Sequence, residues 1–178
     1  IPMYFIVRNN EYINMTRYTF RNFLKKKVFN KTEPTLADWK VHLTTVFPEV
    51  RLKSFIELRG ADGGPWSRVC ALPAFWTGIL YDQENLDETW SKINHWKYTE
   101  IENFYQNVRK NGLNTITPDG EKLSDFTKKI INKSNDGLVR RNIKSNKGNE
   151  STFLEPLKKI LESGKSPAEM WKKLFFSE

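Results

Sequence analysis

The most constraining part of this sequence is an alternating run that leads into a glycine-rich segment and then into an apolar stretch. Between residues 51 and 59 the side chains alternate with a period of two, which is the pattern of a β-strand with one apolar face. The opposite face of this predicted strand carries Arg51, Lys53, Phe55, Glu57 and Arg59. Glycines and a proline in residues 60–66 predict a loop, and the apolar residues from 67 to 81 predict a helix. We therefore expect strand 51–59 to lie beside the core.

The rest of the pattern predicts an α+β fold. Two β-rich runs, 2–8 and 12–15, flank Asn9-Asn10-Glu11 and predict a hairpin, because asparagine tolerates the left-handed backbone of tight turns. Thr19 and Thr35 precede apolar residues at helical spacing, so we expect each to cap a helix. Further helices are expected at 86–93, 100–110, 121–139, 152–161 and 167–175, with Ser151 and Ser166 as caps and a mobile loop at 140–150. The expected architecture is an antiparallel sheet, made of the N-terminal hairpin and strand 51–59, packed against a largely helical C-terminal portion.

Composition excludes several classes of protein. The 178 residues are 38% hydrophobic and 28% charged, which is typical of one folded domain, and no apolar run approaches the roughly 18 residues that span a bilayer. Cys70 is the single cysteine, which excludes a disulfide within the chain and indicates a reducing, cytoplasmic environment. We expect Cys70 to be buried on its apolar helix, and His42 and His95 to serve packing or capping.

The net charge of +8 leaves two function classes open. One is a basic helical module that binds nucleic acid or protein without catalysis. The other is an enzyme whose charged strand binds substrate. Most of the excess charge is lysine scattered among asparagines, which is typical of a solvated surface, so we expect neither nucleic acid nor a membrane as a partner.

The charged face of strand 51–59 is the candidate site. A glutamate flanked by two arginines suits a site that holds a hard divalent cation together with anionic oxygens, because the carboxylate binds metal and guanidinium groups neutralise carboxylate or phosphate. A solvated outer face of an antiparallel sheet would show the same alternation. The residues alone leave both interpretations open.

Three longer motifs resemble glutamate–cysteine ligase of the plant and proteobacterial type. They are PTLADWKVHLTTVFPEVRLK at 34–53, ELRGADGGPW at 57–66 and CALPAFW at 70–76. The resemblance runs more loosely from Pro2 to Glu169, and Glu57-Leu58-Arg59 is similar to the Glu-x-Arg strand of the glutamine synthetase superfamily. It implies that the predicted sheet is part of a glutamine-synthetase-like antiparallel sheet.

The resemblance implies a reaction in which ATP phosphorylates the γ-carboxylate of glutamate and the amine of cysteine displaces phosphate. The product, γ-glutamylcysteine, is the first intermediate of glutathione biosynthesis, and Mg²⁺ is required. By this resemblance Glu57 is a Mg²⁺ ligand, and Arg59 is a catalytic residue that contacts the acyl phosphate or the γ-carboxylate. Arg51 and Lys53 extend the substrate-binding surface. The identity of the amine acceptor stays open.

The family's catalytic domain is much longer than this chain. The resemblance therefore implies that 1–178 is the C-terminal part of one ligase catalytic domain. Within it, 1–66 carries the hairpin, helices and active-site strand and loop, and 67–178 is the helical portion. We expect the chain to need the N-terminal half of that domain, to be inactive alone, and to self-associate through exposed apolar surface.

Overall fold

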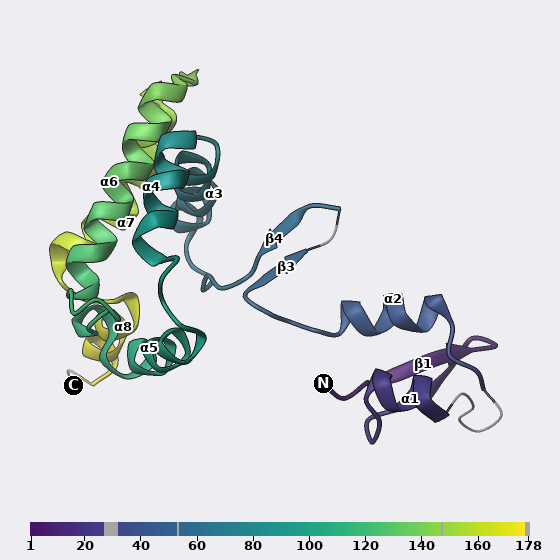
Figure 1. Ribbon diagram of the computed structural model, residues 1–178. Helices are drawn as coiled ribbons and strands as arrows, with labels where there is room; N and C mark the ends of the chain where they lie inside the picture. Colours follow the sequence, from purple (N-terminus) through teal and green to yellow (C-terminus); the bar gives the residue numbers. More distant parts are fainter. Residues whose placement is uncertain (27–31, 53, 147, 177–178) are drawn as a thin grey trace. The chain divides into compact units, whose positions relative to one another are not determined.

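The chain folds into the mixed α+β structure that the sequence predicts, here as a computed structural model that describes residues 1–26, 32–52, 54–146 and 148–176 (Figure 1). It divides into two compact units, Ile1–Asp62 and Gly63–Glu178. The first unit contains β1 (Phe5–Arg8), β2 (Glu11–Asn14), α1 (Phe20–Lys26), α2 (Leu36–Thr44), β3 (Val50–Leu52) and β4 (Ile56–Leu58). The second contains α3 (Trp66–Leu80), α4 (Gln83–Ile93), α5 (Tyr98–Asn111), η1 (Gly112–Asn114), α6 (Leu123–Arg141), β5 (Lys144–Ser145), β6 (Gly148–Asn149), η2 (Glu150–Leu154), α7 (Glu155–Ser163) and α8 (Pro167–Phe175).

The predicted N-terminal hairpin is confirmed. Strands β1 and β2 pair antiparallel, and Arg8 lies opposite Glu11, which leaves a two-residue turn. Both turn residues have positive φ, 48° at Asn9 and 65° at Asn10, as a type I′ hairpin turn requires. The core of this unit lies between the hairpin and α1 and consists of Met3, Ile6, Met15, Phe20 and Phe23.

A buried carboxylate connects this hairpin to α2. Asp38 is 2% exposed, and its oxygens accept hydrogen bonds from the Arg8 guanidinium at 2.6 and 2.7 Å. Asp38 also forms a capping box with Thr35, which confirms Thr35 as the helix cap. Burial raises the pKa of the Asp38 carboxyl, but the hydrogen bonds from Arg8 and Thr35 outweigh burial, so the pKa lies below its ordinary value.

The predicted single strand 51–59 is wrong, because residues 50–58 form an antiparallel hairpin of their own. The predicted common sheet is also wrong, since β3–β4 and β1–β2 form two separate two-stranded sheets. Strand β3 pairs with β4 in the register Val50↔Leu58, Arg51↔Glu57 and Leu52↔Ile56. Each pair has residue numbers of the same parity, so a hairpin in this register shows the same period-two alternation as one strand. The apolar face also does not reach a core within the described residues, since Leu52 is 81% and Ile56 63% exposed.

The helical unit depends on a close crossing of α3 and α6, which lie side by side with α4 in Figure 1. Gly78 and Gly137 meet at this crossing, and a Cβ on Gly137 would lie only 2.1 Å from the Gly78 carbonyl oxygen. The Asn85 amide of α4 donates to the carbonyls of Gly78, at 2.8 Å, and Lys133, at 2.6 Å. The Ser134 hydroxyl donates to the Phe75 carbonyl at 2.8 Å. Glycines therefore let the backbones of α3 and α6 approach closely, and side chain-to-backbone hydrogen bonds join these two helices to each other and to α4.

The remaining helices agree with the sequence pattern except around residue 150. The expected loop at 140–150 contains the short β5–β6 hairpin, and a 3-10 turn precedes α7. The Asn149 side chain accepts the Ser151 N–H, so Ser151 is not the cap of α7. Ser166 does cap α8, through a capping box with Glu169. Among the described residues no helix is long and apolar enough to cross a membrane.

The glycine crossing leads to a stability prediction. We expect Gly137→Ala to lower the free energy of unfolding by about 3 kcal/mol, because its methyl group displaces backbone that cannot yield easily. Gly63→Ala is the matched control, since its Cβ would meet nothing within 4 Å. Urea denaturation followed by circular dichroism measures both variants. Equal free energies of unfolding of the two variants would contradict the close contact of α3 and α6 at Gly137.

A second prediction concerns acid stability. Arg140 donates to both oxygens of Asp82 at 2.8 Å, and these bonds, together with the Asn85 N–H, lower the pKa of Asp82 to about 2. The folded pKa lies below the ordinary value of 3.8, so this stabilisation is complete above about pH 4 and is lost as the pH falls towards 2. Asp82→Asn keeps the helix cap but removes the charge. The free energy of unfolding, measured from pH 5 to pH 2, is expected to fall less steeply with decreasing pH in this variant than in the parent chain. Identical slopes in the two proteins would refute the stabilising role of the Arg140–Asp82 pair.

Candidate functional site

The candidate site is a carboxylate held between two guanidinium groups on the β3–β4 hairpin. Glu57 on β4 lies opposite Arg51 on β3, and the Arg51 Nε donates to Glu57 Oε2 at 2.7 Å. Arg59, just after β4, donates from Nη1 to the other carboxylate oxygen at 3.3 Å. The side chains are 13%, 27% and 33% exposed for Arg51, Glu57 and Arg59, so the cluster is only partly covered. The structure thus brings together three of the four site residues that the sequence predicted.

The segment between α2 and β3 positions both guanidinium groups. Arg51 Nη1 donates to the carbonyls of Thr44 at 3.1 Å and Val46 at 3.3 Å. The Phe47 ring lies 5.0 Å from the Arg59 Cζ and 5.8 Å from the Arg51 Cζ, within the range of cation–π contacts. Phe47 is the part of the site that sequence reasoning missed. The sequence offers little indication of this role, because Phe47 is distinguished only by its position just before Pro48, at the end of a helical pattern.

The electrostatics of this cluster favour an anion. Two guanidinium groups share one carboxylate, so one positive charge is left without a counter-charge within the trio. A phosphate or carboxylate oxygen at the partly exposed edge of Arg59 would gain charge-assisted hydrogen bonds. The geometry therefore suits a carboxylate or phosphate group more directly than a lone cation.

A divalent cation fits here only in part. Glu57 is a carboxylate, which is a ligand type that Mg²⁺ prefers, but it already contacts two positively charged arginines. In the described ranges no group of three or more His, Cys, Asp or Glu side chains could enclose a metal ion. Mg²⁺ is usually held by one or two carboxylates together with substrate phosphates and water. Glu57 is therefore suited to be one ligand among several, and Lys53, the fourth predicted site residue, lies outside the described residues.

The other chemically active side chains have structural surroundings. His42 is 8% exposed and stacks on Phe20, and burial lowers its pKa, which agrees with the expected packing role. The exposed His95 is hydrogen-bonded to Asp119 at 2.7 Å. Cys70 was expected to be buried, but it is only half-buried, because it lines an open groove with Trp66.

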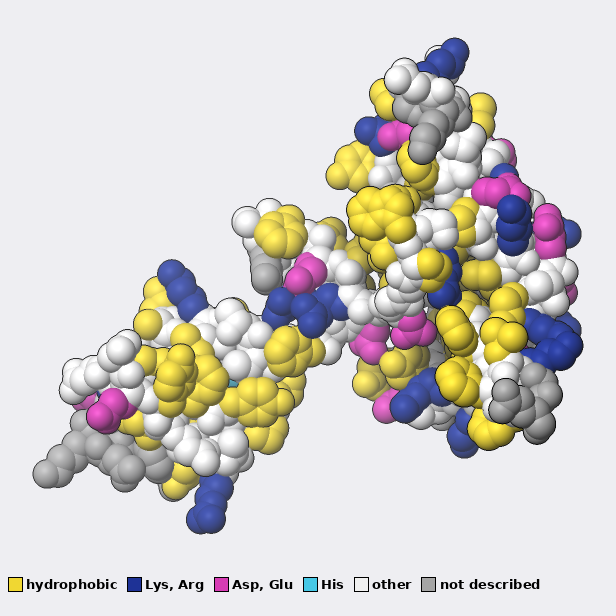
Figure 2. Space-filling view, turned by 180° about the vertical axis from the view of Figure 1, so that it is seen from behind, with side chains coloured by type: hydrophobic (Ala, Val, Ile, Leu, Met, Phe, Trp, Pro, Cys, Tyr) yellow, Lys and Arg dark blue, Asp and Glu magenta, His cyan; other side chains and the backbone are white. Residues whose placement is uncertain are grey.

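The face of the molecule in Figure 2 does not show, among its described residues, a basic stripe of the kind that a nucleic-acid-binding module presents. On the face seen in Figure 2, Lys and Arg side chains lie scattered among acidic and apolar ones. Fold and site together define an α+β protein whose β3–β4 hairpin carries two arginines around one glutamate.

Comparison with known proteins then gives the family. The model of glutamate-cysteine ligase family 2 (GCS2) matches residues 1–174, so the chain belongs to this family. It is 45% identical over 171 residues to glutamate–cysteine ligase A, chloroplastic, of Oryza sativa subsp. indica, which covers 95% of this chain. It is 44% identical over 177 residues to the chloroplastic glutamate–cysteine ligase of Medicago truncatula and 42% identical over 180 residues to that of Arabidopsis thaliana. The chain spans about a third of the length of these relatives: 34%, 34% and 33%.

The shared carboxylate leads to a binding prediction. Glu57→Gln removes the negative charge that both guanidinium groups contact, so we expect the chain to bind inorganic pyrophosphate about fivefold more tightly. Glu11→Gln makes the same change of net charge at an exposed position of the separate β1–β2 hairpin and is expected to leave the affinity within twofold. Isothermal titration calorimetry gives both affinities. If the affinity for pyrophosphate rises equally in the two variants, net charge alone explains the effect. That result would refute an anion site at the arginine–glutamate cluster.

Proposed function

We propose that this chain is the C-terminal part of the catalytic domain of an ATP-dependent carboxylate–amine ligase that joins the γ-carboxylate of glutamate to cysteine. The observation that carries the proposal is the arginine–glutamate cluster on the β3–β4 hairpin of a chain that belongs to the glutamate–cysteine ligase family. The amine of cysteine would displace phosphate from a γ-glutamyl phosphate. This is the step that opens glutathione biosynthesis.

Arg59 is proposed to bind the reacting group. It is the more exposed of the two arginines, and its guanidinium is fixed by Glu57 and by the Phe47 ring. A fixed guanidinium stabilises negative charge that develops on an acyl phosphate without having to reorganise during the reaction. Arg51, which is more buried, would extend the substrate-binding surface, and the same role is proposed for Lys53.

Glu57 is proposed to contribute one oxygen ligand to Mg²⁺. When bound, Mg²⁺ would neutralise charge on the phosphoryl oxygens of ATP. Before that, Glu57 keeps the two arginines at a common position, so it acts first as the group that orients them. Further metal ligands and most of the ATP site are proposed to lie in the other two thirds of the ligase.

Apolar surface supports the proposal that this chain contacts further protein. Leu52 and Ile56 on the hairpin and Leu174 and Phe175 on α8 are all more than 60% exposed. We propose that the N-terminal half of the same ligase domain covers part of this surface, and that the isolated chain self-associates through it. The single cysteine supports a reducing compartment, for which we propose the cytoplasm; the names of the plant relatives assign those enzymes to the chloroplast.

A chimaera tests this function. The matching segment of the Arabidopsis thaliana relative is replaced by this chain, and γ-glutamylcysteine formation is measured with ATP, glutamate and cysteine. We expect the chimaera to be active, and Arg59→Met to lower its kcat/KM about a hundredfold, because an electrostatic donor to the reacting group is lost. Arg21→Met, which removes the same charge from exposed α1, is the control and should retain full activity.

Two results would contradict the proposal. One is an Arg59→Met chimaera as active as its parent. The other is ATP- and glutamate-dependent ligation of cysteine by the isolated chain, which we expect to be inactive.

A further inference from the structure

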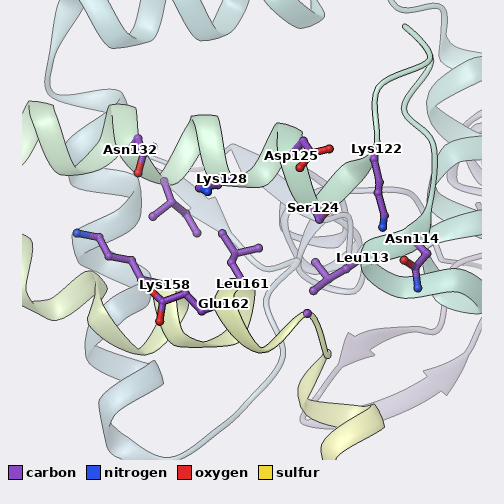
Figure 3. A pocket seen from close by; sticks show the side chains of 12 residues that line it. Leu113, Asn114, Lys122, Ser124, Asp125, Lys128, Asn132, Lys158, Leu161 and Glu162 are labelled. Atoms are coloured by element: carbon purple, nitrogen blue, oxygen red, sulfur yellow. The ribbon is translucent and has the colours of Figure 1, made fainter.

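The helical unit contains a cavity of about 310 Å³ between α6, α7 and η1 (Figure 3). This volume is at the lower end of the range for small-molecule sites in proteins. Figure 3 shows α6 along one side of the cavity and α7 along the other. Its apolar part includes Leu113, Ile131 and Leu161, and Ile131 is 4% exposed.

The lysines that line this cavity differ from their neighbours in one respect. Lys122 and Lys128 line the cavity, and within the described ranges their side chains have no ion pair or hydrogen bond. On the same helix, Lys129 and Lys133 lie outside the cavity and are paired, with Glu121 and Glu88 respectively. The third cavity lysine, Lys158, donates to Asn135 at 2.9 Å. The unpaired lysine just before α6 and the unpaired lysine within it therefore both lie at the cavity.

The same lining limits how much negative charge a ligand can carry. Asp125 and Glu162 also line the cavity, so its three lysines exceed its carboxylates by one. These carboxylates would repel a polyphosphate. A single anionic group could contact a lysine while the carboxylates stay hydrated or accept a hydrogen bond from the ligand. The apolar side chains beside the lysines favour a ligand with a hydrocarbon part.

We propose that this cavity binds a small organic monoanion, a carboxylate with an aliphatic body, whose anionic group contacts Lys122 or Lys128 and whose body packs on Ile131 and Leu161. The inference goes beyond the proposed ligase function. It also stands independently of it, because every residue involved belongs to the helical unit and none belongs to the β3–β4 hairpin.

Titration of the ¹⁵N-labelled 178-residue chain with hexanoate tests this site by NMR. Hexanol, which has the same number of carbon atoms without the charge, and inorganic phosphate, which has charge without hydrocarbon, are titrated in parallel. We expect saturable shifts from hexanoate at residues 122–132 and 158–162. Hexanol and phosphate should each bind at least fivefold more weakly.

A pair of double variants separates the cavity from general surface charge. Lys122→Gln with Lys128→Gln should weaken hexanoate binding about fivefold or more. Lys129→Gln with Lys159→Gln removes two paired and exposed lysines outside the cavity from α6 and α7, and should change the affinity less than twofold. The fold of both variants is checked from their unperturbed NMR peaks.

The remaining outcomes overturn the proposal. These are hexanoate shifts that do not saturate, shifts centred on the apolar groove around Trp90 and Tyr105, equal binding of hexanol or phosphate, and equal loss in the two double variants.

Discussion

The pairing of one carboxylate with two guanidinium groups holds the β3–β4 hairpin together. Each strand has only three residues, and a two-stranded ribbon of this length is marginal in water without further support. Its apolar side chains provide little of that support, since Leu52 and Ile56 are exposed. The Arg51–Glu57 cross-strand pair and the bonds from Arg51 to the carbonyls of Thr44, at the end of α2, and of Val46 supply it instead. The conformation of the hairpin therefore depends on the same charges that can bind an anion.

This dependence connects stability with function. A ligase of this family must bring a nucleotide triphosphate close to a substrate carboxylate, and the two repel each other. Arginines that are already fixed by Glu57 and Phe47 can reduce that repulsion without reorganising when ligands bind. Glu57 neutralises only one of the two arginine charges and leaves the other available within this cluster. We propose that the chain supplies this element and that the rest of the site comes from sequence outside it, since the chain spans only about a third of the length of its relatives.

Local chemistry explains what could be predicted from the sequence. The Asn9-Asn10 turn and the Thr35 and Ser166 caps depend on neighbouring residues only, and all three are confirmed. The β3–β4 turn could not be predicted, because a hairpin that pairs residues of equal parity preserves the alternation of a single strand. The same parity places Arg51, Glu57 and Arg59 on one face in either case, so the candidate cluster was found despite the wrong strand. The Gly78–Gly137 contact and the position of Phe47 arise from non-local packing, which no local pattern reports.

The central claim is that Arg59 and Glu57 face the reacting groups of the ligase. A crystal structure of the active chimaera with Mg²⁺, glutamate and a non-hydrolysable ATP analogue tests it most directly. We predict an oxygen of the glutamate γ-carboxylate or of the terminal phosphate within about 3 Å of the Arg59 guanidinium, and a Glu57 oxygen among the metal ligands. A structure with both ligands ordered and the β3–β4 hairpin in contact with neither would contradict the account.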